Sequence, residues 1–303
     1  MTGWLIYDRT QFEKNRWFAN ELIKRCSSFC KMKLIITERL RFGVDGGKCL
    51  FEYDGELTSA PDFAVNRCIF PLLTLTLEKS GTRVFNSYET AKVCNDKRLT
   101  HLAVSVSGVP MMKTSFFEKR FFEAERVEST CFPCVMKSAG GHGGKEVFLL
   151  QNQAELEKSL SLLETDCFLI QERCRSSRDL RVYVLGGKII GSVLRTPERG
   201  AFKSNFSLGG KVEAFEADSA LISAVNNILS SLPCTPDFVG IDFLFDEKGL
   251  VFNEIEDVVG TRMLYRTTDV DAAELFSQYI EKRMSHQTQT KEQNQNERDC
   301  ISY

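Results

Sequence analysis

The stretch Gly240-Ile-Asp242-Phe-Leu-Phe-Asp246-Glu-Lys-Gly249-Leu-Val-Phe-Asn253-Glu254-Ile-Glu256 predicts two apolar strands, over 239–245 and 250–255, joined by a short turn. Folding about this turn is expected to bring Asp242 close to Glu254. Side chains alternate along a strand, so Glu254 and Glu256 point the same way and Asp242 can join them from the neighbouring strand. Three acidic oxygen donors are therefore expected to converge.

Carboxylates that converge in a partly buried place repel one another unless a cation neutralises them. Hard oxygen ligands of this kind suit Mg²⁺. The alternative is a solvated surface, which is where most Asp and Glu side chains lie. The apolar residues that alternate with the carboxylates weaken that alternative. They are Ile241, Phe243, Val251, Phe252 and Ile255. The hairpin thus predicts a metal site formed by Asp242, Glu254 and Glu256.

Four cationic residues form a second candidate group. Lys97 starts a predicted helix, and Lys137 ends a predicted strand. Arg181 and Arg195 lie on a predicted hairpin that turns at Gly186-Gly187, and a two-residue turn is expected to place them on one face. Each residue alone is more often a solvated surface group. The four residues become a candidate site only when they are considered together.

A glycine-rich loop, Gly140-Gly-His-Gly-Gly-Lys145, follows Lys137 and can expose backbone N–H groups to phosphate oxygens. It is not a P-loop, because Ala139 stands at the position of the first glycine and Glu146 at that of the metal-binding Ser or Thr. No Gly-x-Gly-x-x-Gly fingerprint follows the first strand. A glycine-rich loop alone is more often a turn than a binding site.

Composition narrows the class of protein. With 303 residues, 43% of them hydrophobic, the chain can bury a sizeable core, and its formal charge of -2 favours neither nucleic acid nor a membrane surface as a partner. The 11 scattered Cys predict reduced thiols and a cytoplasmic protein, with Cys131 and Cys134 as a structural pair. No apolar run reaches the length of a membrane span. A homo-oligomer is compatible with the sequence, because symmetric homo-oligomers are common among soluble proteins.

Periodicity divides the chain into four parts. Residues 1–95 predict an α/β domain, with strands at 3–7, 33–37 and 63–66 and helices at 12–26 and 69–80. Residues 96–172 and 173–283 predict two α+β units built from hairpins and helices. Residues 284–303 are rich in Gln, Asn, Lys and Glu and predict a disordered tail.

Seven elements, each unspecific alone, occur along the chain in an order that resembles the ATP-grasp superfamily. They are Asn95-Asp-Lys97; Val-Met-Lys137 before the glycine loop; Ile-Gln171-Glu172; Asp179-Leu-Arg181; Arg195 with Asn205 and Gly209-Gly210; Asp242; and Asn253-Glu254. The chain particularly resembles RimK-like carboxylate-amine ligases of the alpha-L-glutamate ligase type, over roughly residues 1 to 283. The resemblance implies an ATP-grasp fold, with an N-terminal α/β pre-grasp domain and two α+β subdomains that clasp ATP.

The resemblance also implies roles for individual residues. Arg181 and Arg195 would be catalytic and stabilise the transferred phosphoryl group. Residues expected to bind ATP are Lys97, Lys137, Gly141, Gly143, Gly144, Gln171, Glu172, Arg173, Cys174, Asp179 and Asn205. Asp242, Glu254 and Glu256 would hold Mg²⁺, with two ions expected and Mn²⁺ as a substitute. Glu256 departs from the family, which usually has Asn there, and this leaves its role as a ligand and the acceptor substrate open.

The activity implied by this resemblance is ATP-dependent formation of an amide bond through an acyl phosphate, adding glutamate or another amino acid to a peptide, protein or small molecule. Such chemistry depends on positioning and charge, and needs no nucleophilic Ser or Cys. Two alternatives stay open. One is an ATP-grasp kinase that phosphorylates a small molecule without an amine acceptor, and the other is a non-catalytic nucleotide-binding partner protein.

Overall fold

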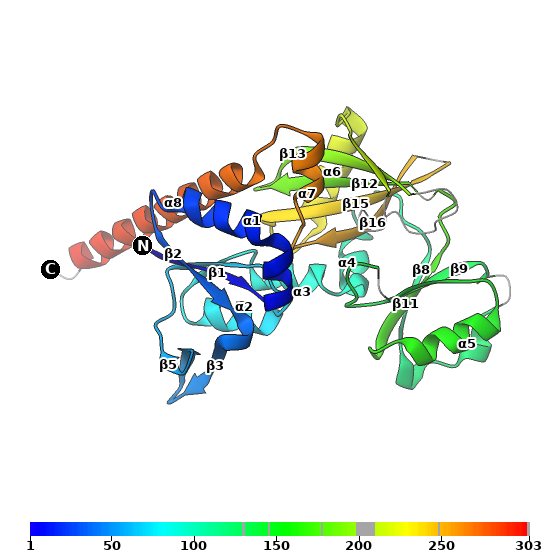
Figure 1. The fold of residues 1–303 in the computed structure, drawn as a ribbon, viewed down its shortest axis with the longest axis horizontal. Coiled ribbons are helices and arrows are strands. Elements are labelled where there is room, and N and C mark those ends of the chain that lie inside the picture. The colour runs from blue at the N-terminus through cyan, green and yellow to red at the C-terminus, as the bar shows by residue number, and fades with distance from the viewer. Residues whose placement is uncertain (129–130, 145, 177, 198–209, 248, 302–303) are drawn as a thin grey trace. The chain divides into compact units, whose positions relative to one another are not determined.

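The structure is a computed structural model that describes residues 1–128, 131–144, 146–176, 178–197, 210–247 and 249–301. It contains two compact units (Figure 1). Unit 1 comprises Met1–Tyr88 and Asp271–Tyr303, and unit 2 comprises Glu89–Val270. The mixed α/β architecture agrees with the fold class expected from the sequence.

Unit 1 is built around a parallel sheet with strand order β2-β1-β6-β7. Its strands are β1 (Thr2–Tyr7), β2 (Lys31–Ile36), β6 (Phe63–Asn66) and β7 (Arg83–Phe85). Helix α1 (Arg9–Cys26) begins where the Asp8 carboxylate accepts a hydrogen bond from the Gln11 N–H, and α2 (Pro71–Lys79) begins at a proline. The expected β-α-β opening is thus confirmed.

A second sheet in unit 1 has the order β3-β4-β5. Its strands are β3 (Leu40–Asp45), β4 (Lys48–Tyr53) and β5 (Glu56–Leu57), and a short 3-10 helix, η1 (Thr37–Arg39), precedes them. Gly46 and Gly47 both have positive φ, 54° and 78°, which a tight hairpin turn requires. The sequence Asp45-Gly46-Gly47 predicts a hairpin turn at this place, and the structure confirms it.

Helix α8 (Ala272–Ile301) belongs to unit 1, whereas the sequence placed residues up to 283 in the last α+β unit. Arg25 of α1 pairs with Asp271 and, at 3.1 Å, with Glu274. Phe276 packs edge-on against Phe85. These contacts link segments far apart in sequence, so local periodicity could not reveal them.

The structure also continues α8 through residues 284–301, where the sequence predicts a disordered tail. The segment contains no Gly or Pro and is rich in Gln, Glu and Lys. These residues lose little rotamer freedom in a helix, so backbone propensity favours helix even where few apolar side chains can be buried.

The first sheet of unit 2 is antiparallel, with strand order β10-β9-β11-β8. Its strands are β8 (Thr114–Glu118), β9 (Cys134–Ser138), β10 (Val147–Leu150) and β11 (Cys167–Glu172); the 3-10 helices η2 (Lys119–Phe121) and η3 (Ala124–Arg126) lie after β8. Helix α5 (Gln153–Leu162) buries Leu156 against the sheet core. The apolar pattern of the sequence predicts strands at 133–137, 146–150 and 167–171 and a helix at 153–163, which match β9, β10, β11 and α5. It does not predict β8.

The second sheet of unit 2 has the order β14-β13-β12-β15-β16. Its strands are β12 (Asp179–Leu185), β13 (Lys188–Thr196), β14 (Lys211–Ala214), β15 (Phe238–Asp246) and β16 (Gly249–Glu256). Helix α6 (Ser219–Ser231), capped by Asp218, packs Leu221, Val225 and Ile228 against it. The other helices are α3 (Tyr88–Cys94), α4 (Lys97–Val104) and α7 (Arg262–Thr267). Both predicted hairpins are confirmed.

The thiols agree with the reduced state expected from the sequence. None of the ten Cys whose side chains the structure describes forms a disulfide, and six of them are buried. Among the described residues, the sole cluster suited to a metal is that of Asp242, Glu254 and Glu256, so Cys131 and Cys134 do not belong to one. Within the same residues, no helix is both long and apolar enough to cross a membrane.

Gly240 provides a test of how tightly β15 is packed. A Cβ at this position would lie 2.6 Å from Val259 Cγ2, and the χ1 angle of a β-branched side chain is too restricted to move aside cheaply. We expect Gly240→Ala to lower the free energy of unfolding by about 1–3 kcal/mol, measured by denaturant titration.

Gly260→Ala is the matched control, because no atom lies within 4 Å of a Cβ there. Adding Val259→Ala to Gly240→Ala should cost less than the sum of the two single changes, since the clash is removed. Strict additivity of the two changes would contradict the proposed clash.

Candidate functional site

A pocket in unit 2 brings together most of the residues singled out from the sequence. Those that line it are Lys97, Lys137, Gly141, Gly143, Gly144, Gln171, Glu172, Cys174, Asp179, Arg195, Glu254 and Glu256. Arg181 and Asp242 are buried and bond to lining residues without lining the pocket themselves. Arg173 is not part of the lining, and Asn205 lies outside the described residues.

The three acidic residues meet as expected. Carboxylate oxygens of Asp242, Glu254 and Glu256 lie within 4.8 Å of one another. Asp242 comes from β15 and is completely buried, whereas the two glutamates come from β16 and are partly exposed to the pocket. The hairpin therefore concentrates negative charge at one wall of the pocket.

A β-bulge, not the turn, puts these carboxylates on one face. Asp246 pairs with Gly249 at the turn, and that register, continued, would set Asp242 opposite Asn253 and turn both glutamates to the other face. Instead Phe243 pairs with Phe252 while Asp242 pairs with Glu254, so Asn253 is an extra residue. The convergence expected from the sequence is correct, but the turn alone does not produce it.

A β-bulge also determines the facing of side chains in the neighbouring hairpin, formed by β12 and β13. Leu185 pairs with Lys188 across the Gly186-Gly187 turn, yet Asp179 pairs with Arg195, because Ile190 is an extra residue on β13. Without this bulge, Arg195 would face away from Arg181, contrary to the expectation drawn from a two-residue turn. The shared face of the two arginines therefore depends on the bulge.

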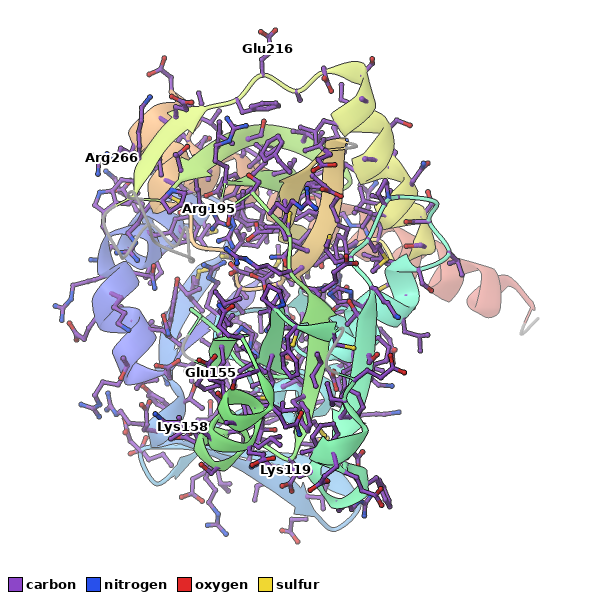
Figure 2. All side chains as sticks on the ribbon, turned by 90° about the vertical axis from the view of Figure 1, so that its right-hand side faces the viewer. Lys119, Glu155, Lys158, Arg195, Glu216 and Arg266 are labelled. Carbon is purple, nitrogen blue, oxygen red and sulfur yellow. The ribbon has the colours of Figure 1, made fainter. Side chains whose placement is uncertain are left out.

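Charged side chains form a continuous chain of ion pairs that runs from the pocket lining into the protein interior. Arg181 donates from Nε and Nη2 to the two Asp242 oxygens, at 2.7 and 2.6 Å, and its Nη1 lies 2.8 Å from Glu256. Arg195 bonds Asp179 through Nε and Nη2, and Nη2 also donates to Asp242 at 2.6 Å. Figure 2 shows Arg195 in the interior, in contrast to the exposed Glu216.

Asp242 remains ionised in spite of its complete burial. Desolvation acts to raise the pKa of this carboxyl, but the charges and hydrogen bonds of Arg181 and Arg195 outweigh it and lower the pKa to about 2. For Glu256 the balance is opposite, because desolvation and the nearby Asp242 and Glu254 charges raise its pKa against the influence of Arg181. The cluster therefore contains one firmly charged carboxylate and one whose charge is disfavoured.

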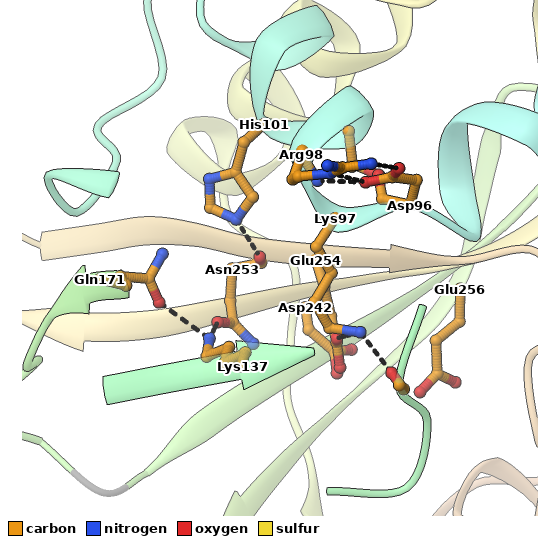
Figure 3. A network of polar contacts seen from close by, with 12 residues as sticks. Asp96, Lys97, Arg98, His101, Lys137, Gln171, Asp242, Asn253, Glu254 and Glu256 are labelled. Carbon is orange, nitrogen blue, oxygen red and sulfur yellow. Dashed lines mark hydrogen bonds and ion pairs between the residues drawn. The ribbon is translucent and has the colours of Figure 1, made fainter. Parts of the chain in front are cut away.

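Two lysines approach the pocket from other elements (Figure 3). Lys137 on β9 donates to Gln171 Oε1 at 2.8 Å and to Asn253 Oδ1 at 2.9 Å. Desolvation by the surrounding protein lowers the pKa of Lys137 to about 8. Lys97 starts α4, whose N-terminus Asp96 caps, and its Nζ donates to Gly141 O and lies 3.8 Å from Glu254.

The glycine loop forms one side of the pocket. Gly143 and Gly144 have φ values of 66° and 71°, a backbone conformation that glycine adopts without strain. A Cβ on Gly141 would lie 2.7 Å from Ser138 Oγ, so glycine is also required there for space. The loop can thus bring its main chain close to a ligand.

The lining also suits the remaining parts of a nucleotide. Val135, Val147 and Leu244 supply apolar surface for a base, beside the segment from Glu172 to Cys174 where β11 ends. The carboxylates offer the hard oxygen donors that Mg²⁺ prefers, while Lys97, Lys137 and Arg195 offer positive charge for phosphates. The residues present therefore fit both ATP and Mg²⁺.

Sequence reasoning missed Asn253 and His101 as parts of this network. Asn253 accepts from Lys137, and its main-chain carbonyl lies 3.1 Å from His101 Nε2 (Figure 3). A signal for the bulge was present, since the apolar residues of β16 that pack into the sheet core are Leu250, Phe252 and Ile255. Their spacing changes from two to three, which indicates one inserted residue.

Comparisons with known proteins identify the family of this chain. The family model described as the RimK-like ATP-grasp domain matches residues 95–280. The chain is 31% identical over 281 residues to human (Homo sapiens) N-acetylaspartylglutamate synthase A, covering 85% of this chain and 70% of that protein. It is 30% identical over 278 residues to beta-citrylglutamate synthase B from Mus musculus, covering 84% and 70%.

Among solved structures, the RimK domain ATP-grasp protein from Sphaerobacter thermophilus matches with a TM-score of 0.67 and 18% identity, over 92% of this chain and 99% of that chain. This likeness shows the ATP-grasp fold. The family model covers more than half of the chain, and the two sequence relatives are named as synthases of N-acetylaspartylglutamate and beta-citrylglutamate. The chain therefore belongs to the RimK-like ATP-grasp family and is an ATP-dependent carboxylate-amine ligase.

Proposed function

We propose that the protein joins a carboxylate to the amino group of glutamate, or of a closely similar amino acid, in the pocket of unit 2. The observation that carries this proposal is the meeting of three carboxylates, Asp242, Glu254 and Glu256, with Lys97, Lys137 and Arg195 around one pocket. Both synthases to which the chain is similar have glutamate in the name of their product. That supports glutamate as the amine.

The carboxylate must be activated before an amine can displace one of its oxygens, because oxide and hydroxide are poor leaving groups. A carboxylate oxygen attacks the γ-phosphorus of ATP, ADP leaves, and an acyl phosphate forms. The amine nitrogen then attacks the acyl carbon, the C–O bond to phosphate breaks, and the proton lost from nitrogen leaves with the departing inorganic phosphate. Each step gathers negative charge on phosphate oxygens, so fixed positive groups lower the barrier.

The arginines have different roles in this proposal. Arg195 lines the pocket and is held by Asp179 and Asp242, so its guanidinium is oriented before the substrate arrives. It would stabilise the transferred phosphoryl group. Arg181 lies behind the lining, bonded to Asp242 and Glu256, and would orient these two carboxylates.

ATP and metal would occupy the rest of the pocket. Lys97, Lys137 and the main chain of Gly141, Gly143 and Gly144 would bind phosphates, and Gln171 would orient Lys137 through their hydrogen bond. The segment Glu172-Arg173-Cys174 would contact the adenosine part. Asp242, Glu254 and Glu256 would hold two Mg²⁺ ions, or Mn²⁺ in their place, which neutralise phosphate charge. We place the protein in the cytoplasm, which the free thiols support.

Glu254→Gln tests the metal site and the reaction together. The substitution removes one charge from a ligand of unchanged size, so we expect kcat/KM to fall by about 10²-fold or more. ADP release and product mass should be measured with ATP, a panel of small acids and short peptides, and glutamate. Glu216→Gln, at an exposed site, is the matched control and should retain wild-type rates.

The products decide between the candidate functions. Condensation predicts ADP formation when carboxylate and amine are both present, with a mass gain equal to glutamate minus water. Accumulation of a stable phosphorylated product in the absence of amine would instead identify a kinase. Nucleotide binding without turnover across the whole panel would contradict catalysis.

Proton uptake on nucleotide binding tests Lys137. Its pKa is lowered to about 8 in the free protein, and adjacent phosphates should raise that pKa because they favour the charged form. At a pH between the pKa of Lys137 in the free protein and its higher pKa in the complex, nucleotide binding must take up a proton. Nucleotide affinity should therefore fall as pH rises through about 8. Titration calorimetry in buffers of different ionisation enthalpy measures this uptake.

Lys137→Arg supplies the control, because arginine keeps its charge throughout this pH range. We expect the variant to bind nucleotide without the proton uptake that belongs to position 137. The uptake that belongs to Lys137 should be on the order of one proton or less. Equal proton uptake by wild type and variant between about pH 8 and pH 10 would show that Lys137 does not titrate on binding.

A further inference from the structure

His101 is a buried titratable residue that the reaction described above does not use. It lies on α4, only 3% exposed, one turn after Lys97. Residues four apart in a helix share a face, so α4 presents both side chains to β16. Lys97 lies 3.8 Å from Glu254, and His101 Nε2 lies 3.1 Å from the Asn253 carbonyl oxygen (Figure 3).

The surroundings of the imidazole determine its tautomer. A carbonyl oxygen can only accept, so Nε2 must carry the proton and donate to Asn253 O. His101 Nδ1 is buried and has no hydrogen-bond partner among the described residues. Placing the proton on Nδ1 would leave a buried donor unpaired and set two lone pairs against each other, at greater cost than an unpaired acceptor.

Burial keeps this imidazole neutral. Desolvation, together with the positive charge of Lys137, lowers the pKa of His101 to about 4; the Asn253 hydrogen bond and Glu254 oppose this, and Lys97 adds to it. The Phe252 ring packs against the imidazole at 5.5 Å between centroids. His101 is therefore fixed on two sides, by an aromatic contact and by a donated hydrogen bond.

The atom to which His101 donates belongs to the extra residue of β16. Asn253 is the residue that shifts the register between Phe243 and Asp242 and so turns Glu254 and Glu256 toward Asp242. The same residue accepts from Lys137 through its side-chain oxygen. Its carbonyl and its side chain thus receive hydrogen bonds from two different elements, α4 and β9.

We propose that His101 is a positioning residue, which holds the bulge at Asn253 and through it sets Glu254, Glu256 and Lys137 in the geometry that binds metal and nucleotide. The expected effect of His101 on catalysis rests on the ligase function proposed above. The effect on metal binding follows from the geometry alone, because the carboxylates depend on the bulge for their common face.

Two substitutions of similar polarity separate the hydrogen bond from general packing. In His101→Gln the amide nitrogen stands as many bonds from Cα as Nε2 and can donate to Asn253 O. In His101→Asn the amide nitrogen stands at the position of Nδ1 and cannot reach. His101→Leu keeps apolar volume against Phe252 and removes the donor.

The primary measurement is Mn²⁺ affinity in the presence of ADP, by paramagnetic resonance, on the full chain. We expect His101→Asn and His101→Leu to lose affinity by about 10- to 100-fold, as other residues that orient metal ligands do. His101→Gln should stay close to wild type. The kcat for ADP release should fall in the same order, while the tautomer is read from imidazole ¹⁵N shifts of the wild type.

Val104→Ala is the stability control, because Val104 is completely buried on the same helix and packs in the sheet core. It should unfold more easily yet keep Mn²⁺ affinity. Equal affinity in His101→Gln and His101→Asn would overturn the proposal, as would an Nδ1-protonated imidazole. If the wild type binds Mn²⁺ and ADP but ligates nothing, the proposed function fails while the order of affinities still decides the role of His101.

Discussion

The carboxylate of Asp242 is completely buried between two guanidinium groups, and the rest of the site depends on this contact. A buried ion tolerates no loss of a partner, because an unpaired charge in the interior is strongly destabilising. Asp242 therefore requires β12, β13 and β15 to keep their registers to within one residue. The cluster is weak evidence of stability but a strict constraint on geometry.

Two bulged residues satisfy that constraint, and they show why the site was only partly predictable. The acidic and basic residues could be named from the sequence, because charges within apolar strands are conspicuous. The face on which each charge lies depends on the strand register. Ile190 and Asn253 each add one residue to a strand and so turn the side chains beyond them to the other face. The apolar spacing of β16 contained a signal for its bulge, whereas on β13 the corresponding core position is Ser192, which gives no such signal.

The fold was predictable where contacts are local. Glycine turns, alternating strands and helical periodicity identified most elements of both units. Strand β8 and the docking of α8 on α1 were missed, since the short, partly exposed β8 has little apolar alternation and α8 depends on the distant ion pairs of Arg25. Sequence pattern therefore identifies elements, while distant contacts decide which unit holds them.

The balance of charges in the site also explains how its cationic side chains are kept in place before a polyanionic substrate binds. Four carboxylates, those of Asp179, Asp242, Glu254 and Glu256, are matched by the four cations Arg181, Arg195, Lys97 and Lys137. The arginines are paired with aspartates, whereas Lys137 donates to two neutral amide oxygens. Phosphate can therefore approach Lys137 without breaking an ion pair. Because these groups are oriented before binding, little reorganisation opposes the reaction, which is the condition under which fixed charges stabilise a transition state most.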